Sequence, residues 1–365
     1  MIRIGFISYQ NQPHDLFPKP RLRALLAEAA LQGAELVLLD RSSWDRRQGL
    51  IAGERWTPAG WSSGWFSLPD VVVVKSGADD DWQELDGWIR RSRPVIADSG
   101  LDKLAFHELL CGSSLLPHAI PTVGIPPDAI DATLMAVFLE HGSAVVKPVD
   151  GRRGFGIQFI HRENGDGETG SGNTWQVQHA GGTIRGTLSE IVDHVRARIA
   201  GRLRYRRYLV QRFIHSVAVD GRSADIRVHV QRRADGEWGV TRAYVRLAEA
   251  GRFLTNISQG GYQGPIDGFL SVRRNAAEAA ELGNRIVALA MEIAKLVDAT
   301  KPLPLSELGI DLALDERDRL WAIEVNAFPQ SSLHEHARAE HMIGYAMAVA
   351  RGTTGHERLA ADRAP

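Results

Sequence analysis

The chain has 365 residues, a formal net charge of −1, 44% hydrophobic residues and 24% charged residues. These values are typical of a soluble globular protein with two or three packed lobes. The balanced charge gives no electrostatic basis for binding nucleic acid or an anionic membrane, so we expect neither partner. No apolar run approaches the roughly 20 residues that span a bilayer, and the N-terminus has the pattern of a strand instead of a signal peptide. We therefore expect a cytoplasmic protein.

The chain contains one cysteine, Cys111. A single cysteine excludes an intrachain disulfide, which fits a reducing compartment. Because Cys111 lies in an apolar segment, we expect it to be a buried packing residue.

The first hundred residues alternate between strand and helix patterns. The predicted elements are strands at 2–8, 35–39, 69–75 and 94–98 and a helix at 20–33. Residues 71–74 are four consecutive valines, which is typical of a strand buried on both faces of a parallel sheet. Residues 45–68 are rich in Trp, Gly and Ser and predict a long connection, which forms either part of a substrate pocket or a packed surface loop.

The remaining pattern predicts an α/β (α+β) protein with further lobes. A helix at 101–110 contains Lys103, a proline-punctuated linker follows, and the polar, glycine-rich segment 163–182 is expected to be a mobile insertion. The other predicted helices are 128–141, 188–201, 276–296 and 332–351, and the other predicted strands are 144–148, 156–160, 208–214, 225–232, 238–247, 307–314 and 320–326. The expected division is an α/β lobe at 1–116, a linker at 117–127, a small lobe at 128–207, a C-terminal lobe at 208–351 and a frayed tail at 352–365.

Residues 145–148 read Val-Val-Lys-Pro and lead into a glycine-rich turn. Lys147 ends a predicted strand, and Gly151, Gly154 and Gly156 follow before the next strand begins. Glycines let backbone amides approach phosphate oxygens closely, and lysine adds a point charge. The loop has neither the Lys-Ser/Thr pair of a Walker A loop nor the spacing of a dinucleotide fingerprint. We interpret it as a flap over a triphosphate, with a plain hairpin turn as the alternative.

A second motif predicts a metal site. Glu324 and Asn326 are two residues apart on a predicted strand and therefore project from the same face. The preceding strand carries Asp311, which a hairpin could bring opposite them. Two carboxylates and an amide oxygen suit Mg²⁺, which prefers hard oxygen ligands. The alternative is that Asp311 only ends a strand and that Glu324 pairs with an arginine.

Two further strands carry candidate nucleotide contacts. Residues 209–214 form an apolar strand that ends in a polar break, which can offer backbone groups to an adenine edge, although any core strand has this pattern. Asp225 and Arg227 share a strand face. Together with Arg242 and Arg246 they indicate a bidentate clamp for phosphate or for a substrate carboxylate. Each arginine taken alone could instead form a surface ion pair.

In this order the motifs resemble the ATP-grasp superfamily over nearly the whole chain, and most closely the YheC/YheD-type, endospore-coat-associated ATP-grasp family. The distinctive stretches are residues 255–261 (TNISQGG), 307–312 (ELGIDL) and 321–329 (WAIEVNAFP). The resemblance implies an ATP-grasp fold, in which an N-terminal open α/β lobe precedes two α+β lobes that sandwich ATP. It also implies ATP and two Mg²⁺ ions as cofactors, with Mn²⁺ able to substitute.

The resemblance implies roles by position. Glu324 would bridge two Mg²⁺ ions that Asp311 and Asn326 also bind. The implied nucleotide-binding residues are Lys103, Lys147, Gly151, Arg153, Gly154, Phe155, Gly156, the hinge residues Gln211, Arg212, Phe213 and Ile214, and Asp225 at the ribose. The implied catalytic residues are Lys147, Arg227, Arg246 and Asn256. A substrate carboxylate would meet Arg242, Ser331 and Ser332.

The sequence also departs from related ligases. Leu254 stands where they carry a basic residue, so Arg227, Arg242 or Arg246 would have to supply the cation of the transition state. Arg212 replaces a common acidic hinge residue, and the turn at 328–332 is altered.

The implied reaction is that of an ADP-forming carboxylate–amine ligase. A small-molecule or peptide carboxylate would be activated as an acyl phosphate and passed to an amine or similar nucleophile. An ATP-grasp kinase and a non-catalytic assembly protein of the spore coat are the alternatives, and association with the spore coat and a homodimer both stay open.

Three histidines near the C-terminus, His334, His336 and His341, raise the alternative of a metal site. His334 and His341 are seven residues apart and could share one helix face, whereas His336 would point elsewhere. The three readings are a zinc site, a substrate contact and an ordinary polar helix.

Overall fold

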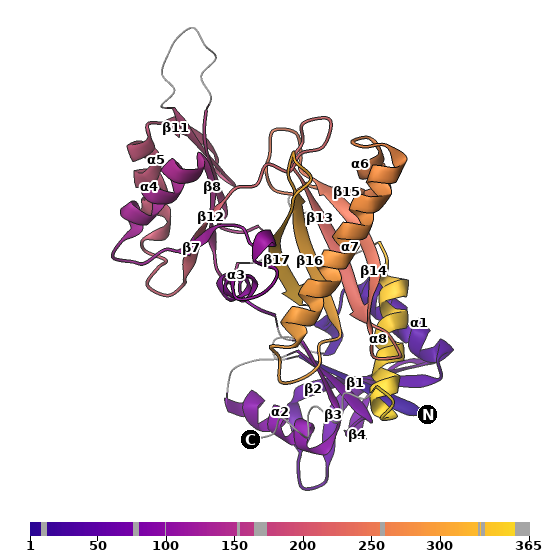
Figure 1. Ribbon diagram of the computed structural model, residues 1–365. Coiled ribbons are helices and arrows are strands. Elements are labelled where there is room, and N and C mark those ends of the chain that lie inside the picture. Colours follow the sequence, from indigo (N-terminus) through magenta and orange to yellow (C-terminus); the bar gives the residue numbers. More distant parts are fainter. Residues whose placement is uncertain are drawn as a thin grey trace.

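The computed structural model describes residues 1–8, 13–75, 80–98, 100–151, 154–163, 174–255, 260–327, 329 and 333–354. The chain forms three sheets, each covered by its own helices (Figure 1). No helix in these ranges is both long enough and apolar enough to cross a membrane.

The N-terminal sheet has the strand order β4-β3-β2-β1-β5-β6. Its strands are β1 (Ile2–Ser8), β2 (Ala34–Asp45), β3 (Leu50–Thr57), β4 (Gly60–Ser67), β5 (Val71–Lys75) and β6 (Val95–Asp98). β2, β1, β5 and β6 are parallel, whereas β3 and β4 add an antiparallel extension at one edge. The prediction of a long connection at 45–68 is therefore wrong, because this segment is mostly a hairpin whose aromatic and β-branched residues suit strands.

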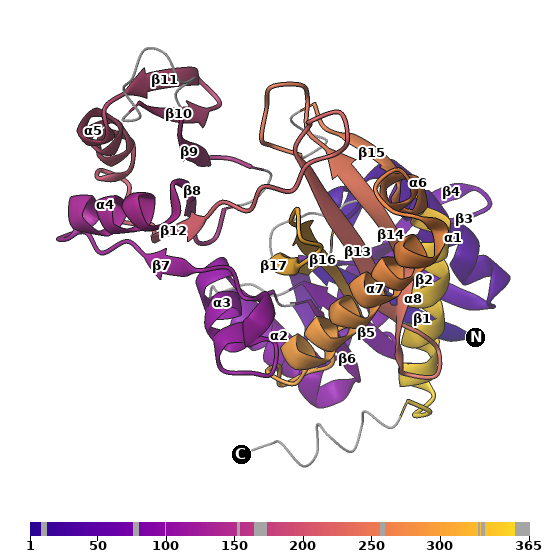
Figure 2. The same cartoon turned by 45° about the horizontal axis from the view of Figure 1, so that its top comes forward.

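Helices cover both faces of the N-terminal sheet. They are α1 (Lys19–Leu31), α2 (Asp80–Ser92) and the C-terminal α8 (Glu335–Ala350), with a short 3-10 helix η1 (Pro13–Asp15) before α1. Val71 and Val73 pack with α1 and α8, while Val72 and Val74 pack with α2. The valine run is thus buried on both faces, as predicted. Because α8 packs against α1 and the N-terminal sheet, it connects the last helix of the described chain to the first lobe (Figure 2).

The small lobe is an antiparallel sheet with the order β11-β10-β9-β8-β12-β7. Its strands are β7 (Thr122–Gly124), β8 (Ser143–Pro148), β9 (Gln158–Arg162), β10 (Trp175–His179), β11 (Gly182–Gly186) and β12 (Tyr208–Arg212). Helices α4 (Ile130–His141) and α5 (Leu188–Ile199) pack on it. The predicted linker contains β7 and the 3-10 helix η2 (Leu116–His118), and the predicted insertion contains β10 and the start of β11.

The C-terminal sheet has the order β15-β14-β13-β16-β17, and all its strand pairs are antiparallel. Its strands are β13 (Ala224–Arg232), β14 (Trp238–Leu247), β15 (Tyr262–Pro265), β16 (Glu307–Leu314) and β17 (Leu320–Ala327). Helices α3 (Lys103–Cys111), α6 (Ile266–Ser271) and α7 (Ala276–Asp298) cover its apolar face. Its other face therefore holds the polar residues of β13, β16 and β17.

One packing prediction fails. Cys111 is exposed instead of buried, because it ends α3 on the side opposite to the buried residues Phe106 and Leu110. His107, one turn earlier, lies beside its thiol at 3.5 Å.

Candidate nucleotide and metal site

A cavity of about 130 Å³ lies between the small-lobe sheet and the polar face of the C-terminal sheet. It brings together many of the predicted site residues, although they are up to 177 positions apart in the chain, from Lys147 to Glu324. Those that line it are Lys147, Gln211, Arg212, Phe213, Ile214, Asp225, Arg246, Asp311 and Glu324. The opposed sheets thus form one site from both lobes.

The three predicted metal ligands meet on the β16–β17 hairpin. Asp311 pairs with Glu324, and Gly309 pairs with Asn326. Nδ2 of Asn326 donates to Oε1 of Glu324 at 3.0 Å and lies 3.4 Å from Oδ2 of Asp311. The two carboxylates suit Mg²⁺, which takes oxygen ligands and shares its shell with phosphates and water. Here Asn326 directs its amide nitrogen at them, so it would have to turn its side-chain amide over to offer the metal an oxygen.

Protein cations surround these carboxylates. Burial opposes the charged form of Glu324, but Lys103 and Lys147 lower the pKa of this carboxyl well below its usual range. Burial raises the pKa of Asp311 even though Arg227 and Arg246 favour its ionised form. The cluster therefore lies in a low-dielectric site, where the interaction energy between charges is larger than in water.

Two arginines cross the face of the C-terminal sheet. Arg227 makes a two-pronged contact with Asp311, with Nη2 to Oδ2 at 2.8 Å. Arg246 donates to both carboxylate oxygens of Asp225, at 2.5 and 2.8 Å, and its Nη2 lies 2.9 Å from Oδ2 of Asp311. Asp225 also accepts a hydrogen bond from the Thr255 hydroxyl. Each arginine is thus held by a bidentate ion pair, which fixes its orientation.

Lys147 is buried at the end of β8, as the sequence predicts. Its Nζ donates to Oε1 of Gln211 at 2.8 Å, and Nε2 of Gln211 donates to the Thr122 hydroxyl at 2.8 Å. Burial lowers the pKa of Lys147 to about 8, with Glu324 acting in the opposite direction. The side chain of Gln211 therefore fixes the position of the Lys147 ammonium group.

Lys103 joins three parts of the chain. It begins α3, where the Asp102 carboxylate caps the helix. Its Nζ donates to the Gly151 carbonyl at 2.5 Å and lies 3.3 Å from Glu324. The Lys103 side chain thus links the glycine loop to the β16–β17 hairpin.

Two of the three glycines in the loop have a left-handed backbone. Gly154 and Gly156 have φ values of 76° and 75°, which other residues rarely adopt. A Cβ on Gly156 would also lie 3.2 Å from Pro148. Phe155 between them is 64% exposed, so the loop presents an apolar side chain to solvent.

Some predicted residues lie elsewhere. Arg242 is exposed on β14, two strand positions beyond Tyr244. The predicted residues Arg153, Asn256, Ser331 and Ser332 lie outside the described residues. Thr122 was missed by the sequence analysis, since a single threonine carries no motif signal, and Thr255 was part of a motif but its hydrogen bond to Asp225 was not predicted.

The three C-terminal histidines do not gather into a metal site. His334 is buried and bonded to His229, His336 is exposed, and His341 lies on α8. Within the described ranges, no three His, Cys, Asp or Glu side chains are placed to hold a metal ion. The zinc alternative thus has no support in this part of the chain.

A larger open groove of about 1410 Å³ also borders the hinge. It shares Arg212, Phe213 and Ile214 with the cavity, but its described lining contains neither Lys147 nor Glu324. The groove has arginines and carboxylates of its own, but its described lining lacks the predicted phosphate and metal residues, so we assign the candidate site to the smaller cavity.

Comparison with known proteins agrees with this geometry. The YheC/D like ATP-grasp family matches residues 92–349. Endospore coat-associated protein YheD of Bacillus subtilis (strain 168) is 23% identical over 311 residues, which cover 82% of this chain and 65% of YheD. The chain thus spans less than two thirds of the length of this relative.

Two solved structures share the fold. D-cycloserine synthetase DcsG superposes with a TM-score of 0.52 at 15% identity, covering 98% of this chain and 99% of DcsG. The ATP-grasp ligase PsnB, solved with a phosphomimetic precursor variant, Mg and ADP, gives 0.52 at 16% identity, covering 97% and 99%. Both likenesses confirm the expected fold of three lobes and carry no more than the fold at these identities.

Proposed function

This chain belongs to the YheC/D like ATP-grasp family, and we propose from this that it is a Mg-ATP-dependent ligase. It would activate a carboxylate as an acyl phosphate, release ADP and pass the acyl group to an amine or similar nucleophile. The observation that carries the proposal is that Lys147, Asp311 and Glu324 line the same cavity between two lobes. The ADP and Mg in the PsnB structure support it by analogy.

Each set of residues has a proposed role. Lys103 and Lys147 would bind phosphate oxygens, and the backbone of Gly151, Gly154, Phe155 and Gly156, with Arg153, would cover them. Residues 211–214 would hold the adenine and Asp225 the ribose. Mg²⁺ bound by Asp311, Glu324 and Asn326 would neutralise charge on the phosphates. The division into lobes at 1–116, 128–207 and 208–351, which we predicted from the sequence, is also part of this proposal.

The chain's own cations would stabilise the phosphoryl transfer. Arg227 and Arg246 are placed beside the carboxylate of Asp311, where charge would develop on the transferring group. Asn256 and the substrate contacts Arg242, Ser331 and Ser332 are proposed from the family pattern. The flap over the phosphates would exclude water, which protects an acyl phosphate from hydrolysis.

The test is ADP release with a panel of carboxylates in the presence of hydroxylamine. A ligase gives carboxylate-dependent ADP and a hydroxamate, which forms when hydroxylamine captures the acyl phosphate. Carboxylate-independent ADP release with a stable phosphoester would instead show a kinase. Glu324→Gln should abolish both products in a folded protein.

A non-catalytic role is the second candidate, because the relative YheD is named as coat-associated. On that reading the protein binds Mg-ATP or has lost binding, and it assembles with other proteins of the coat. Absence of ADP release with every carboxylate, despite tight Mg-ATP binding, would favour this candidate. Oligomerisation as a homodimer is a further proposal that light scattering would test.

A further inference from the structure

The polar face of the C-terminal sheet continues beyond the nucleotide site towards α8. Side chains two apart on a strand share a face, so Arg227 and His229 of β13 project together, as do Tyr244 and Arg242 of β14. Arg227 pairs with Tyr244, and His229 pairs with Arg242. The second pair lies about 7 Å further from Asp311, since a strand rises about 3.3 Å per residue.

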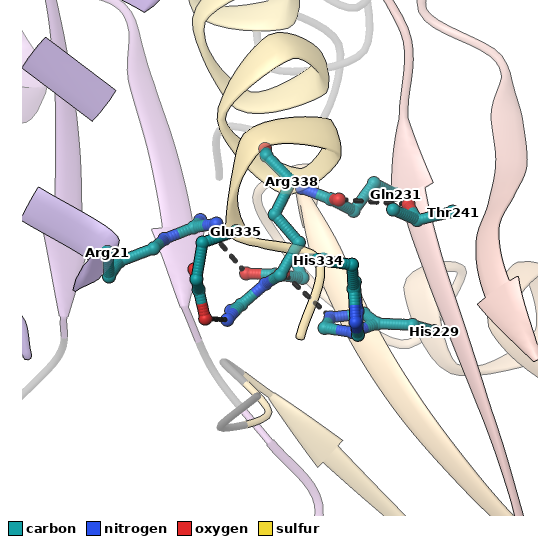
Figure 3. A network of polar contacts seen from close by, with 8 residues as sticks. Arg21, His229, Gln231, Thr241, His334, Glu335 and Arg338 are labelled. Atoms are coloured by element: carbon teal, nitrogen blue, oxygen red, sulfur yellow. Dashed lines mark hydrogen bonds and ion pairs between the residues drawn. The ribbon is translucent and has the colours of Figure 1, made fainter. Parts of the chain in front are cut away.

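A chain of buried side chains forms one wall of this region (Figure 3). His229 Nε2 lies 2.7 Å from Oε1 of Glu307, and its Nδ1 lies 2.7 Å from Nε2 of His334. Arg338 donates to the same oxygen of Glu307 at 2.6 Å, and Arg21 of α1 lies 3.6 Å from the other. These cations hold Glu307 ionised, so the carboxylate must accept and His229 Nε2 must donate.

The protonation of both rings follows from this contact. Burial lowers the pKa of His229 to about 4 and that of His334 to about 3, so both rings are neutral near pH 7. With its proton on Nε2, His229 accepts at Nδ1, and His334 therefore donates from Nε2. The wall is a rigid and uncharged pair of imidazoles with fixed tautomers.

This network has an evident structural use. Arg21 comes from the N-terminal lobe, Glu307 from the C-terminal sheet, and Glu335 and Arg338 from α8. Together they fasten the N-terminal lobe and α8 to the sheet. That use accounts for the charges of these four residues, but it does not involve Tyr244 or Arg242.

Among the described residues on this face of the sheet, Tyr244 and Arg242 take no part in that network. Tyr244 is 4% exposed, but within the described residues its hydroxyl has no hydrogen bond and is not one of the fully buried unpaired polar atoms, so it remains accessible to a ligand. Arg242 is exposed and makes no ion pair within the same ranges. The ring of Tyr244 packs against His334, with centroids 5.9 Å apart, so the wall holds it in place.

The backbone beside Arg242 is also irregular. The register of β13 and β14 shifts between His229 and Val230, which leaves Thr241 as an extra residue. Bulges of this kind re-aim neighbouring side chains and are frequent beside active sites. Thr241 is fixed by donating to Gln231 at 2.9 Å, so the bulge is anchored directly before Arg242.

We propose that Arg242 and the Tyr244 hydroxyl form a subsite for an anionic group of the substrate, separate from the carboxylate that is activated. This inference rests on the proposed ligase function and adds the substrate class. The substrate would carry a second carboxylate about 7 Å from the reacting group, two strand positions away. Arg242 would bind it by charge, and Tyr244 would donate a hydrogen bond to it.

The test is a binding experiment on the full chain loaded with Mg²⁺ and AMP-PNP. The probes are the straight-chain dicarboxylates from succinate to pimelate, each compared with its ω-monoamide, in isothermal titration calorimetry. We expect at least one dicarboxylate to bind about tenfold or more tightly than its monoamide, as expected for a charge-assisted pair. Arg242→Gln should remove this preference, and Tyr244→Phe should weaken dicarboxylate binding.

Arg23→Gln, which changes an exposed arginine of α1, is the matched control and should bind like the wild type. The affinity for AMP-PNP should be equal in all four proteins, which shows that the fold and nucleotide site are intact. The inference is wrong if no dicarboxylate binds the loaded wild type, or if Arg242→Gln binds as tightly. Dicarboxylate binding through Arg242 without any ADP release would instead overturn the ligase proposal and leave the subsite standing.

Discussion

Nζ of Lys103 lies 3.3 Å from Oε2 of Glu324 and donates to the Gly151 carbonyl at 2.5 Å. Lys103, at the start of α3, thus couples the β16–β17 hairpin to the glycine loop. Removing its charge should loosen both segments at once. Lys103→Met should weaken Mg-AMP-PNP binding about tenfold or more, since hydrogen bonds to charged groups contribute about 1.5–3 kcal/mol. Lys295→Met on α7 should bind like the wild type in the same titration, and equal affinities would contradict the role of Lys103.

The two metal-site carboxylates should respond differently to substitution. Asp311 compensates both Arg227 and Arg246, so Asp311→Ala leaves the buried guanidinium of Arg227 without its carboxylate partner and that of Arg246 with Asp225 alone. We expect it to lower the free energy of unfolding by about 3–5 kcal/mol. Glu324→Gln keeps the shape of its side chain and should retain most of the stability while losing Mg²⁺-dependent nucleotide binding. Urea unfolding and nucleotide titration separate the two effects.

Glu292→Gln, on the exposed side of α7, is the control for both measurements. If Asp311→Ala unfolds at the wild-type urea concentration, the two ion pairs contribute no net stability. If Glu324→Gln binds nucleotide with unchanged Mg²⁺ dependence, the metal assignment is wrong.

The sequence predicts the local elements well because their signals are local. The valine run, the amphipathic α7 and the β16–β17 hairpin all follow from periodicity and turn residues. The alternation of Glu324 and Asn326 likewise places both on one strand face. The hairpin of β3 and β4 was missed, because its Gly and Ser residues mask the strand pattern.

The parts of the site that the sequence could not supply depend on contacts between distant segments. His229 follows Arg227 by two residues, so its face was predictable, but its partners Glu307 and His334 lie 78 and 105 positions away. The pairing of Lys147 with Gln211 across β8 and β12 is similar. Without the register of the strands, neither the contacts of His229 with Glu307 and His334 nor the position of Lys147 can be derived.

Gly309 should tolerate no side chain. A Cβ at this position would lie 2.6 Å from Cβ of Pro329 and 3.2 Å from Nη1 of Arg227. Gly309→Ala should therefore destabilise the fold by about 1–3 kcal/mol, the usual cost of overpacking. Gly268→Ala in α6, where nothing lies within 4 Å, should be neutral or slightly stabilising. Thermal unfolding measures both, and equal melting temperatures would show that residue 329 can move aside.

The buried histidine pair should make the protein sensitive to acid. The pKa values of His229 and His334 fall to about 4 and 3 in the folded protein because both rings are buried. Below about pH 6.5, the unfolded chain binds protons that the folded chain does not, so stability falls with pH. Each ring should contribute a slope that approaches about 1.4 kcal/mol per pH unit near pH 5 and decreases at lower pH as the folded ring itself takes up a proton.

The free energy of urea unfolding, measured from pH 7.5 to pH 4.5, tests this. His229→Asn should have a shallower slope than the wild type, even if its stability at pH 7.5 is lower. His336→Asn, at an exposed position of α8, should keep the wild-type slope. A wild-type slope in His229→Asn would mean that this ring is not neutral in the folded protein.

Nucleotide binding should take up a proton at alkaline pH. Burial lowers the pKa of Lys147 to about 8 in the nucleotide-free protein, so at pH 9 most of the protein carries a neutral Lys147. Phosphate oxygens beside Nζ favour the ammonium form and should raise this pKa on binding. Binding at pH 9 should therefore take up close to one proton, whereas binding at pH 7 should take up almost none. Titration calorimetry in buffers of different ionisation enthalpy measures the uptake directly.

Lys147→Arg should bind with no uptake at either pH, because a guanidinium stays protonated. If Lys147→Arg and the wild type take up equal amounts at pH 9, the proton goes to another group and Lys147 does not meet the phosphates.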